Sequence, residues 1–530
     1  MQRPAVKLIT GGFRSTAFPA LEYEAYRFPT NLRLLRCLFR AAARLRTLPP
    51  SHPLFDRVEA ALASASSTYP SPLSLNLRAY SSLAADVEVE QLLPCAIAPW
   101  ERDPQPPTFI AASKELAAEH HDQVIASADP TAILIYTDGS MLECHVGCGV
   151  ALQSLQGFGR GQLHSALLSV RPSGGKGSSD NLLTLPLPLA AWGGHAALLG
   201  LRQTVYAGQL EGISMGLDNL LRAGPLLPSP PLEAHFFVDN QAGVGHSCSP
   251  QPSPGQAQRL RIRQQLQQVH TSLPTTTLAF HWVPGHVSID GNERADDEAK
   301  AGAWASILPH EADHRAARGL PPLSLLEDAL GRDEKRQREE EGKYFGRSNA
   351  QRRERVKAAS SRPQPVSRSA LCADFDKGLK ARWAREWREE KRGARLRKID
   401  GCPPGLHTLK LHANLSRRHN SILTQLWTGR SHLRGDLFKM RIEPSPFCVC
   451  ERIESREHFL LSCPLFTLAR RKLRVATKGE PLEVSTLLSN PLLIPATLTY
   501  INETERFPKY YAVVAEAAKK EADGGGGDLA

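Results

Sequence analysis

The sequence predicts an α/β fold in which acidic residues follow buried strands. Residues 132–136 are four apolar residues and a tyrosine that lead to Asp138, which indicates a buried strand that ends by presenting a carboxylate. Residues 235–238 form a second such strand, which ends at Asp239. Between the two strands, residues spaced four apart from Val205 to Leu217 would share one face of a helix, and this face is expected to pack on the sheet.

A third aspartate, Asp296, is also expected close to a core element of the fold. The apolar segment 280–283 leads through a loop to Asp296, so that Asp138, Asp239 and Asp296 are all expected at the ends of core elements. Mg²⁺ takes oxygen ligands, and two such ions can hold the attacking and leaving oxygens in phosphoryl transfer. Without metal, carboxylates held so close would repel one another. A single aspartate at a strand end is more often a turn former, so only the set of three favours a site for divalent cations.

The residues around these aspartates resemble the ribonuclease H (type 1) domain found in the reverse transcriptase polyprotein of fungal non-LTR (LINE-like) retrotransposons. The matching motifs are YTDGS at 136–140, TVYA at 204–207, VDNQA at 238–242, WVPGH at 282–286 and GNERAD at 291–296. They extend over about a third of the chain. The resemblance implies a mixed five-stranded sheet flanked by helices, two Mg²⁺ ions that Mn²⁺ can replace, and hydrolysis of the RNA strand of an RNA/DNA hybrid.

The resemblance also implies roles for individual residues. Asp138 would bridge both metal ions, Asp239 and Asp296 would complete the metal shells, and His286 would lie on a mobile loop that assists turnover. The hybrid would be held through its backbone and 2′-hydroxyl groups rather than through base sequence. The residues expected to contact the substrate are Ser140, Asn240 and Asn292.

One position departs from the family pattern. The family has a fourth acidic ligand within a pattern like Tyr-Ala-Ala-Glu-Leu, whereas residues 206–210 of this chain have Gln209 in place of the glutamate. A neutral amide holds Mg²⁺ less strongly than a carboxylate does, so weaker metal binding and slower cleavage are expected. Glu211 is rotated about 200° from Gln209 around the helix, and it is expected to be a solvated surface residue; replacement of the missing ligand by Glu211 is the less favoured alternative.

Two other functions stay open. Gly208 beside Gln209 weakens the helix by about 1 kcal/mol relative to Ala, and both changes fit a nucleic-acid-binding remnant that keeps the fold but has lost much of its activity. Strand transfer of the integrase type is less favoured, because integrases lack the Trp-Val-Pro-Gly-His motif that is present at 282–286.

The composition favours a polyanionic partner. The 530 residues include 65 Lys and Arg against 54 Asp and Glu, a net charge of +11. Such a surplus suits nucleic acid, although a solvated, non-specific surface would also account for it. Ten cysteines without the spacing of a disulfide scaffold, and no secretory signal, predict an intracellular location that is nuclear or cytoplasmic. The apolar stretch 182–200 is interrupted by Pro and Gly, so no membrane span is expected.

The regions around the predicted sheet domain differ in composition. The N-terminal region resembles the stretch that follows the reverse transcriptase in these elements, and the chain looks like the back end of a longer polyprotein. No Tyr-x-Asp-Asp motif occurs, so reverse transcription by this chain alone is not expected. The expected divisions are a helical remnant at 1–110, a ribonuclease H domain at 128–305 with a flexible insertion at about 156–200, a charged linker at 306–380, a helical zinc-binding region at 381–475 and a tail at 476–530.

The C-terminal region contains a cysteine and histidine motif. Cys448, Cys450, His458 and Cys463 form a Cys₃His set, which suits tetrahedral Zn²⁺. Four protein ligands would close the site, so the zinc would be structural; free buried cysteines are the alternative. A similar Cys-His-Cys segment follows a stretch like 425–433 in the same retroelement proteins, and the resemblance implies contact with nucleic acid.

Other aromatic residues and histidines of this region are less informative. Trp383 and Trp387 share one helix face, which favours packing in a core over stacking on nucleic-acid bases. His407, His412 and His419 are expected to be surface residues rather than ligands.

Overall fold

The computed structural model describes residues 2–63, 87–155, 192–318 and 358–507, together with part of the segment 71–80. Within these ranges the residues 99, 102, 103, 143, 228, 286, 288, 363 and 479 are not described, and only the backbone is described for 308–318. Residue 286, the histidine expected on a mobile loop, therefore lies outside the described residues, as do most of the expected insertion and most of the expected linker.

The chain forms two compact units, whose boundaries differ from the expected divisions. One unit comprises residues 38–374, and the other joins residues 1–37 to residues 375–530. The sequence predicts a separate helical region over 1–110, whereas the first 37 residues pack with the C-terminal region. The ring of Tyr23, for example, stacks on that of Trp387 with 4.4 Å between the centroids. Contacts between residues so far apart in the sequence leave no local pattern.

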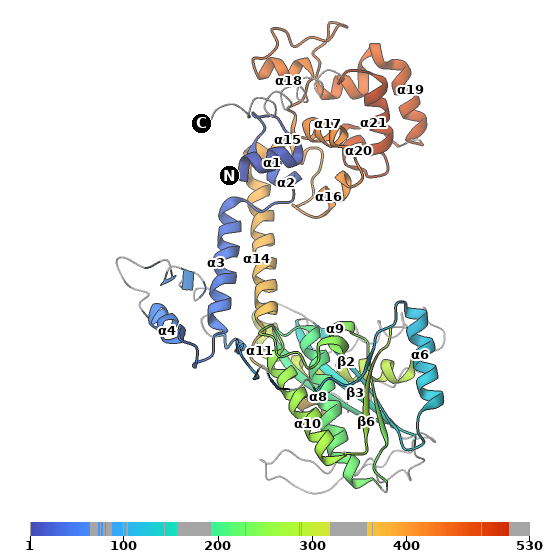
Figure 1. Ribbon diagram of the computed structural model, residues 1–530. Helices are drawn as coiled ribbons and strands as arrows, with labels where there is room; N and C mark the ends of the chain where they lie inside the picture. Colours follow the sequence, from blue (N-terminus) through green and yellow to red (C-terminus); the bar gives the residue numbers. More distant parts are fainter. Residues whose placement is uncertain are drawn as a thin grey trace, which may run out of the picture. The chain divides into compact units, whose positions relative to one another are not determined.

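The unit of residues 38–374 is built on a mixed sheet, as predicted (Figure 1). Its strand order is β1-β6-β5-β2-β3-β4-β7; β2, β3 and β4 are antiparallel, whereas β5 and β6 run parallel to β2. The strands are β1 (Thr108–Phe109), β2 (Ile133–Leu142), β3 (His145–Ser154), β4 (Trp192–Leu201), β5 (Glu233–Val238), β6 (Thr277–Trp282) and β7 (Ser360–Ser361). The five longer strands form the expected sheet, and two-residue strands pair along its edges. β4 takes up the last part of the interval 156–200, where a flexible insertion was expected.

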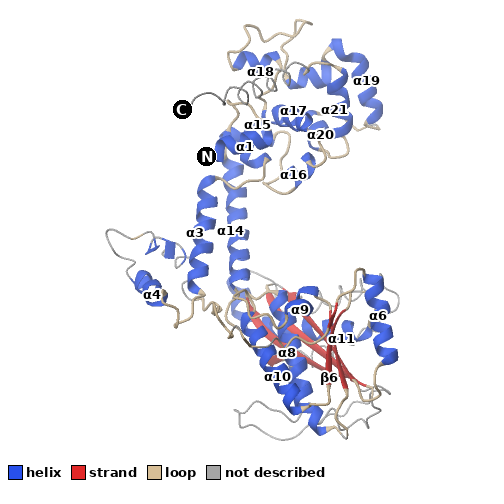
Figure 2. Ribbon diagram, viewed as in Figure 1, coloured by secondary structure: helices blue, strands red, loops and turns tan. Residues whose placement is uncertain are grey.

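Helices cover both faces of this sheet (Figure 2). α8 and α10 pack on one face, where their apolar residues join Ile133 and Ile135 of β2 in a buried core. α6 and α11 lie on the other face with Leu134 and Tyr136. Among the described residues, the helices that lie wholly in this unit are α4 (Phe55–Ala63), α6 (Lys114–Ser127), α8 (Val205–Ala223), a 3₁₀ turn (Gly224–Leu226), α9 (Gln241–His246), α10 (Gln256–Ser272) and α11 (Asp290–Arg318). Alternate residues of β2 face opposite cores because side chains alternate along a strand.

Two glycines allow α11 to lie directly on β3. A Cβ atom at Gly147 would overlap the backbone of Ala303, and one at Gly149 would overlap the backbone of Ala295. Only residues without a side chain permit this approach. Gly149 is the partner of Asp138 in the β2–β3 pairing, so the close contact places the start of α11 beside that aspartate.

The second unit is helical, and its core combines leucine and isoleucine with several large aromatic residues. Trp387 and Trp427 are buried with Tyr23 and Phe459, and the indole of Trp427 donates to the carbonyl of Leu488 at 2.8 Å. The helices that contribute residues are α1 (Gln2–Thr10), α2 (Phe18–Glu24), α3 (Thr30–Arg46), α14 (Arg368–Glu389), a 3₁₀ turn (Lys391–Gly393), α15 (Ala394–Arg397), α16 (His407–His412), α17 (Arg417–Thr428), α18 (Arg434–Lys439), a π turn (His458–Ser462), a 3₁₀ turn (Pro464–Phe466), α19 (Thr467–Ala476), α20 (Val484–Ser489) and α21 (Ile494–Glu503). α20 and α21 occupy a segment that was expected to be a tail.

The two tryptophans of α14 pack inside the protein, as the helical spacing favoured. Trp383 and Trp387 are each 3% exposed, and Trp383 packs in a small cluster with Leu32 and Leu379. Burial leaves neither indole face available for stacking on a base. Among the described residues, no helix combines the length and the apolar character that crossing a membrane requires.

A row of histidines connects β5, β6 and α6. Nε2 of His120 lies 3.0 Å from Nδ1 of His281, and Nε2 of His281 lies 3.1 Å from Nδ1 of His235. His235 in turn is 3.1 Å from the carboxylate of Glu233. Burial and the three neighbouring histidines, His235, His120 and His121, lower the pKa of His281 to about 3. The folded protein therefore holds this central imidazole neutral.

Because His281 is held neutral in the folded chain, we expect the protein to lose stability in acid. In the unfolded chain His281 takes up a proton as the pH falls below its ordinary pKa of 6.5, whereas in the folded chain it does so only near pH 3. The free energy of unfolding should fall across this interval by up to about 5 kcal/mol. In urea unfolding at pH 7 and pH 4.5, His281→Gln should lose less stability between the two pH values than the wild type. The same replacement at the exposed His270 is the control, and equal losses in wild type and His281→Gln would contradict the prediction.

Candidate metal centres

Asp138 lies inside β2 rather than at its end. The strand continues to Leu142 as one arm of the hairpin with β3, which the apolar pattern did not reveal. The Asp138 side chain is 6% exposed, and its Oδ1 accepts hydrogen bonds from the Gly139 amide and from Nε2 of Gln209, both at 2.6 Å. Burial, together with the negative charges of Asp239 and Asp296, raises the pKa of Asp138 well above its usual range. The structure therefore places three carboxylates near one another.

Gln209 bridges two of these carboxylates. From α8 its Nε2 donates to Oδ1 of Asp138 at 2.6 Å and to Oδ1 of Asp239 at 2.5 Å. The amide therefore presents its NH₂ group to both carboxylates, whose oxygens accept the hydrogen bonds. The other end of the amide, Oε1, is buried and has no hydrogen-bond partner among the described residues. Gln209 thus lies at the position expected of a fourth ligand, but its NH₂ group is placed between the carboxylates of Asp138 and Asp239.

Asp239 and Asp296 approach from different elements. Asp239 directly follows β5, and its carbonyl accepts the indole N–H of Trp282 at 3.0 Å, which fixes the backbone at the end of the strand. Asp296 is in the first part of α11, and its Oδ2 is 2.6 Å from Nζ of Lys300. Lys300 was not identified from the sequence. Its position four residues after Asp296 on a helix is the signal that could have revealed it.

The three residues expected to contact substrate differ in their burial and hydrogen bonds. Ser140 is two residues beyond Asp138 on β2, and Asn240 caps α9 by accepting the Gly243 amide at 3.0 Å. Asn292 is buried, and its Oδ1 has no hydrogen-bond partner among the described residues. Asn240 therefore has a structural role, while a substrate role for any of the three stays a prediction.

Glu211 is buried, not solvated as expected. Its carboxylate has no exposed surface and lies 2.9 Å from the guanidinium of Arg261 and 2.8 Å from that of Arg362. The helical rotation that turns Glu211 away from Gln209 directs it toward these two arginines rather than toward solvent. A paired, fully buried carboxylate is not available to replace the missing acidic ligand.

The cysteine and histidine motif forms a compact cluster in the helical unit. The ligand atoms of Cys448, Cys450, His458 and Cys463 all lie within 4.8 Å of one another. Sγ of Cys450 is 3.2 Å from Nε2 of His458 and 4.0 Å from Sγ of Cys463. Burial raises the pKa of Cys463 to about 12, so without a cation this thiol stays protonated. Soft sulfur atoms and one imidazole at these separations are a ligand set that suits Zn²⁺.

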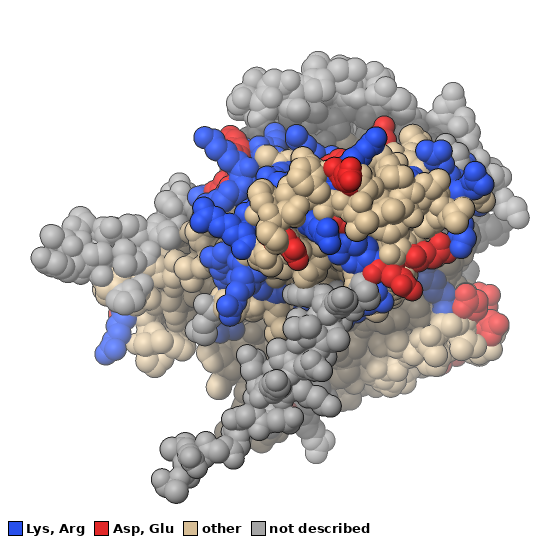
Figure 3. All heavy atoms as spheres, turned by 90° about the horizontal axis from the view of Figure 1, so that it is seen from above, with Lys and Arg blue, Asp and Glu red and all other residues tan. Residues whose placement is uncertain are grey.

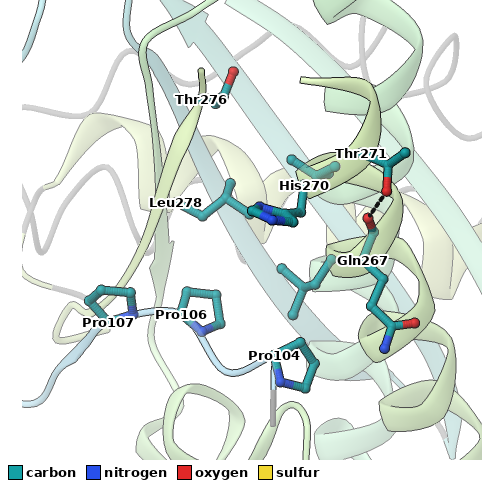
Figure 4. Close-up of a pocket in the computed structure, with 10 residues that line it drawn as sticks. Pro104, Pro106, Pro107, Gln267, His270, Thr271, Thr276 and Leu278 are labelled. Atoms are coloured by element: carbon teal, nitrogen blue, oxygen red, sulfur yellow. Dashed lines mark hydrogen bonds between the residues drawn. The ribbon is translucent and has the colours of Figure 1, made fainter. Parts of the chain in front are cut away.

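A separate hollow lies between α10 and the start of β6 (Figure 4). Prolines and the side chains of Leu278 and His270 line it, and Thr271 donates to the Gln267 carbonyl at 2.9 Å. Leu278 pairs with Ala234 near the beginning of β5, whereas Asp239 follows the other end of that strand. The hollow is therefore distinct from the carboxylates and contains none of them.

No family model and no curated protein sequence matches the chain. Solved structures are similar to part of it. They include the N-terminal ribonuclease H domain of a Mycobacterium tuberculosis protein (17% identity, 33% of this chain and 99% of that chain, TM-score 0.21) and ribonuclease H1 of Halobacterium salinarum NRC-1 (14%, 32% and 96%, TM-score 0.20). LC11-RNase H1 in complex with an RNA/DNA hybrid is also similar (15%, 32% and 96%, TM-score 0.21). Each similarity covers about a third of this chain and nearly all of the other.

The bridging amide leads to a prediction for Gln209→Glu. A fourth carboxylate, close to Asp138 and Asp239, should destabilise the metal-free protein by about 2 kcal/mol, because one more like charge is then added to the group. The same carboxylate should strengthen Mg²⁺ binding, so the rise in melting temperature on adding Mg²⁺ should be larger than in the wild type.

The control is another buried glutamine that donates to an aspartate. Gln265 donates to Asp218 at 2.6 Å, away from the metal centre. Gln265→Glu should also lower stability but should not increase the response to Mg²⁺. Equal Mg²⁺ responses in Gln209→Glu and the wild type would show that Gln209 does not adjoin a metal site.

Proposed function

We propose that residues 128–305 form a metal-dependent endonuclease that hydrolyses the RNA strand of RNA/DNA hybrids, within a retrotransposon-derived protein. The observation that carries the proposal is the convergence of Asp138, Asp239 and Gln209 on one another, with Asp296 close enough to raise the pKa of Asp138. Four separate elements, β2, the end of β5, α8 and α11, supply these side chains. No structural need of the sheet accounts for three carboxylates in one place.

The residues present fit divalent cations. Asp138 is buried beside two other carboxylates, a charge arrangement that cations stabilise. The unpartnered Oε1 of Gln209 would become a ligand if the amide turned over, since an amide oxygen can also coordinate Mg²⁺. Asp138 would bridge two ions, with Asp239, Asp296 and Gln209 as the remaining protein ligands. Bound Mg²⁺ or Mn²⁺ would supply an activated water and stabilise the departing 3′ oxygen.

Lys300 and the predicted contact residues would complete the site. Without a bound cation, the ammonium group of Lys300 pairs with the carboxylate of Asp296. A bound cation would compete with Lys300 for this carboxylate. Ser140, Asn240 and Asn292 would contact the hybrid, chiefly through its backbone and 2′-hydroxyl groups, so sequence specificity should be low. His286 is proposed to assist turnover.

The C-terminal region is proposed to bind nucleic acid as well. Arg471, Lys472 and Arg474 of α19 are exposed. Figure 3 shows Lys and Arg side chains in several places on the face that it draws, most densely at the left, with Asp and Glu side chains also present. Such a surface favours a polyanion, and its binding should weaken as salt is added.

A catalytically impaired, nucleic-acid-binding remnant is the second candidate. The observation that favours it is the pair of hydrogen bonds through which the Gln209 amide already satisfies Asp138 and Asp239. Cations must displace these bonds before they can bind, which lowers their affinity. Both candidates predict hybrid binding, and they differ in turnover.

A cleavage assay separates the two candidates. The full chain is incubated with an end-labelled RNA/DNA hybrid in Mg²⁺ or Mn²⁺, beside Asp138→Asn, Gln209→Glu and the exposed control Asp122→Asn. An active nuclease should cleave the RNA strand, and Asp138→Asn should lower the rate by at least roughly 100-fold, the upper end of the effect of losing an outer-shell partner. Asp122→Asn should cleave as the wild type does.

Two other results of this assay would contradict the proposal of an active nuclease. A silent wild type with activity restored in Gln209→Glu would identify the impaired remnant. Cleavage that is equal in the wild type and Asp138→Asn would contradict both assignments of the site. Anisotropy measurements of hybrid binding show whether each variant is folded and competent to bind.

We also propose that Cys448, Cys450, His458 and Cys463 hold a structural Zn²⁺ ion, and that the protein is intracellular. None of the ten cysteines, all of which are described, forms a disulfide, which suits a reducing compartment. Zinc would link the loop around Cys448 to the turn that contains His458. Because an unfolded chain rarely retains such a site, zinc binding would stabilise the folded state. Four protein ligands leave no open position for chemistry.

Removal of one thiol should release this zinc. Atomic emission of purified Cys450→Ser should show about one zinc ion per chain fewer than the wild type, and its melting temperature should be lower because binding energy contributes to folding. The exposed Cys95 provides the control Cys95→Ser, which should keep the wild-type zinc content. Unchanged zinc in Cys450→Ser would exclude the site.

A further inference from the structure

A second group of metal-ligating side chains lies in the helical unit, apart from the Cys₃His cluster. Asp400, Cys402 and His407 each offer one ligand atom, and these atoms all lie within 4.8 Å of one another. They come from one loop, which ends at the start of α16. The sequence spacing gave no reason to group them, and His407 was expected to be a surface residue.

Asp400 is the buried centre of the group. It is 5% exposed, its Oδ1 accepts the Cys402 amide at 3.0 Å, and its Oδ2 lies 2.8 Å from Nε2 of His407. Cys402 is exposed, and the side chain of His407 is 36% exposed. A buried carboxylate therefore faces an imidazole and a thiol that solutes can reach.

The hydroxyl of Tyr23 shows that acceptors are in excess here. It lies 2.9 Å from Oδ2 of Asp400, 3.0 Å from the carbonyl oxygen of Cys402 and 3.2 Å from Nε2 of His407. One hydroxyl proton can serve only one of these groups at a time. The pKa of Cys402 is raised, first by its hydrogen bond to Asp400, then by burial and the charge of that carboxylate. A carboxylate, a carbonyl oxygen and an imidazole thus converge on one hydroxyl group.

The loop is held in shape by its own residues. Pro403 and Pro404 follow Cys402 and restrict the backbone. At Gly405 a Cβ atom would lie 2.9 Å from Nδ1 of His407, so the glycine leaves room beside that ring nitrogen. The ligand atoms are therefore positioned before any ion binds, which reduces the entropy lost on binding.

We propose that Asp400, Cys402 and His407 bind a second Zn²⁺ ion, with solvent completing its coordination. A thiol, an imidazole and a carboxylate suit zinc, whereas Mg²⁺ prefers oxygen ligands alone. Three protein ligands leave one tetrahedral position open, unlike the closed Cys₃His set. Through Tyr23 the ion would also stabilise the packing of α2 against the loop, since this hydroxyl donates within the ligand group.

The test is zinc stoichiometry on the full chain. After equilibrium dialysis against buffered free Zn²⁺, atomic emission should give about two ions per chain in the wild type and about one in Cys402→Ser. Cys37→Ser removes another exposed cysteine of the same unit and should leave two. Cys450→Ser should retain the ion at Cys402, so the two sites are scored independently.

Accessibility of the thiol provides a second measurement. Zn²⁺ should slow alkylation of Cys402 by iodoacetamide, read as modified peptide by mass spectrometry, and should not slow alkylation of Cys37. His407→Ala should abolish the protection, with folding checked by its melting temperature in EDTA. Equal zinc in wild type and Cys402→Ser, or alkylation of Cys402 that ignores Zn²⁺, would each overturn the proposal.

Discussion

Repulsion among buried carboxylates is the constraint on which the proposed site depends. Asp138 is almost without solvent, and the charges of Asp239 and Asp296 oppose its ionisation. Two side chains of the protein relieve that repulsion: the amide of Gln209 lies between Asp138 and Asp239, and the ammonium group of Lys300 pairs with Asp296. The folded chain is thereby stabilised without cations, and the same contacts must be exchanged when cations bind.

The fold creates this constraint through close packing. Gly149 lies opposite Asp138 and has no side chain to hold α11 away from β3, so the start of α11 brings Asp296 to the same end of the sheet. On the other face, Gly139 allows α8 to approach β2, which brings Gln209 within reach of Asp138. A substitution at either glycine would change the separations of the carboxylates without altering a single ligand.

The sequence predicted those parts of the structure that depend on local patterns. The strands around residues 133–138, 233–238 and 277–282 follow from runs of apolar residues, and the helix that carries Gln209 follows from residues spaced four apart. Glu211 shows what such local patterns do not predict, namely whether a polar side chain is buried. Its rotation away from Gln209 was predicted, but its burial depends on Arg362, which lies 151 positions later in the chain.

Long-range contacts also explain the other differences. Residues 1–37 pack with the C-terminal region through contacts such as that between Tyr23 and Trp387. The sequence gives no sign that these two residues are in contact. His407 likewise resembles a surface residue until the fold brings Tyr23 to it from a distant part of the sequence. Motif spacing identified the Cys₃His set because three thiols and an imidazole are groups that Zn²⁺ prefers, whereas Asp400, Cys402 and His407 lie within eight residues of sequence but do not form such a motif.

Diffraction from crystals soaked in Mn²⁺ tests the central claim most directly, because anomalous scattering locates the ion without reference to activity. The carboxylates are predicted to coordinate Mn²⁺, with anomalous density between Asp138 and Asp239 and with the Gln209 amide turned so that Oε1 faces the ion. Asp138→Asn crystals should lack this density. Density confined to other places, with Gln209 still donating to both aspartates at saturating Mn²⁺, would contradict a shared metal centre.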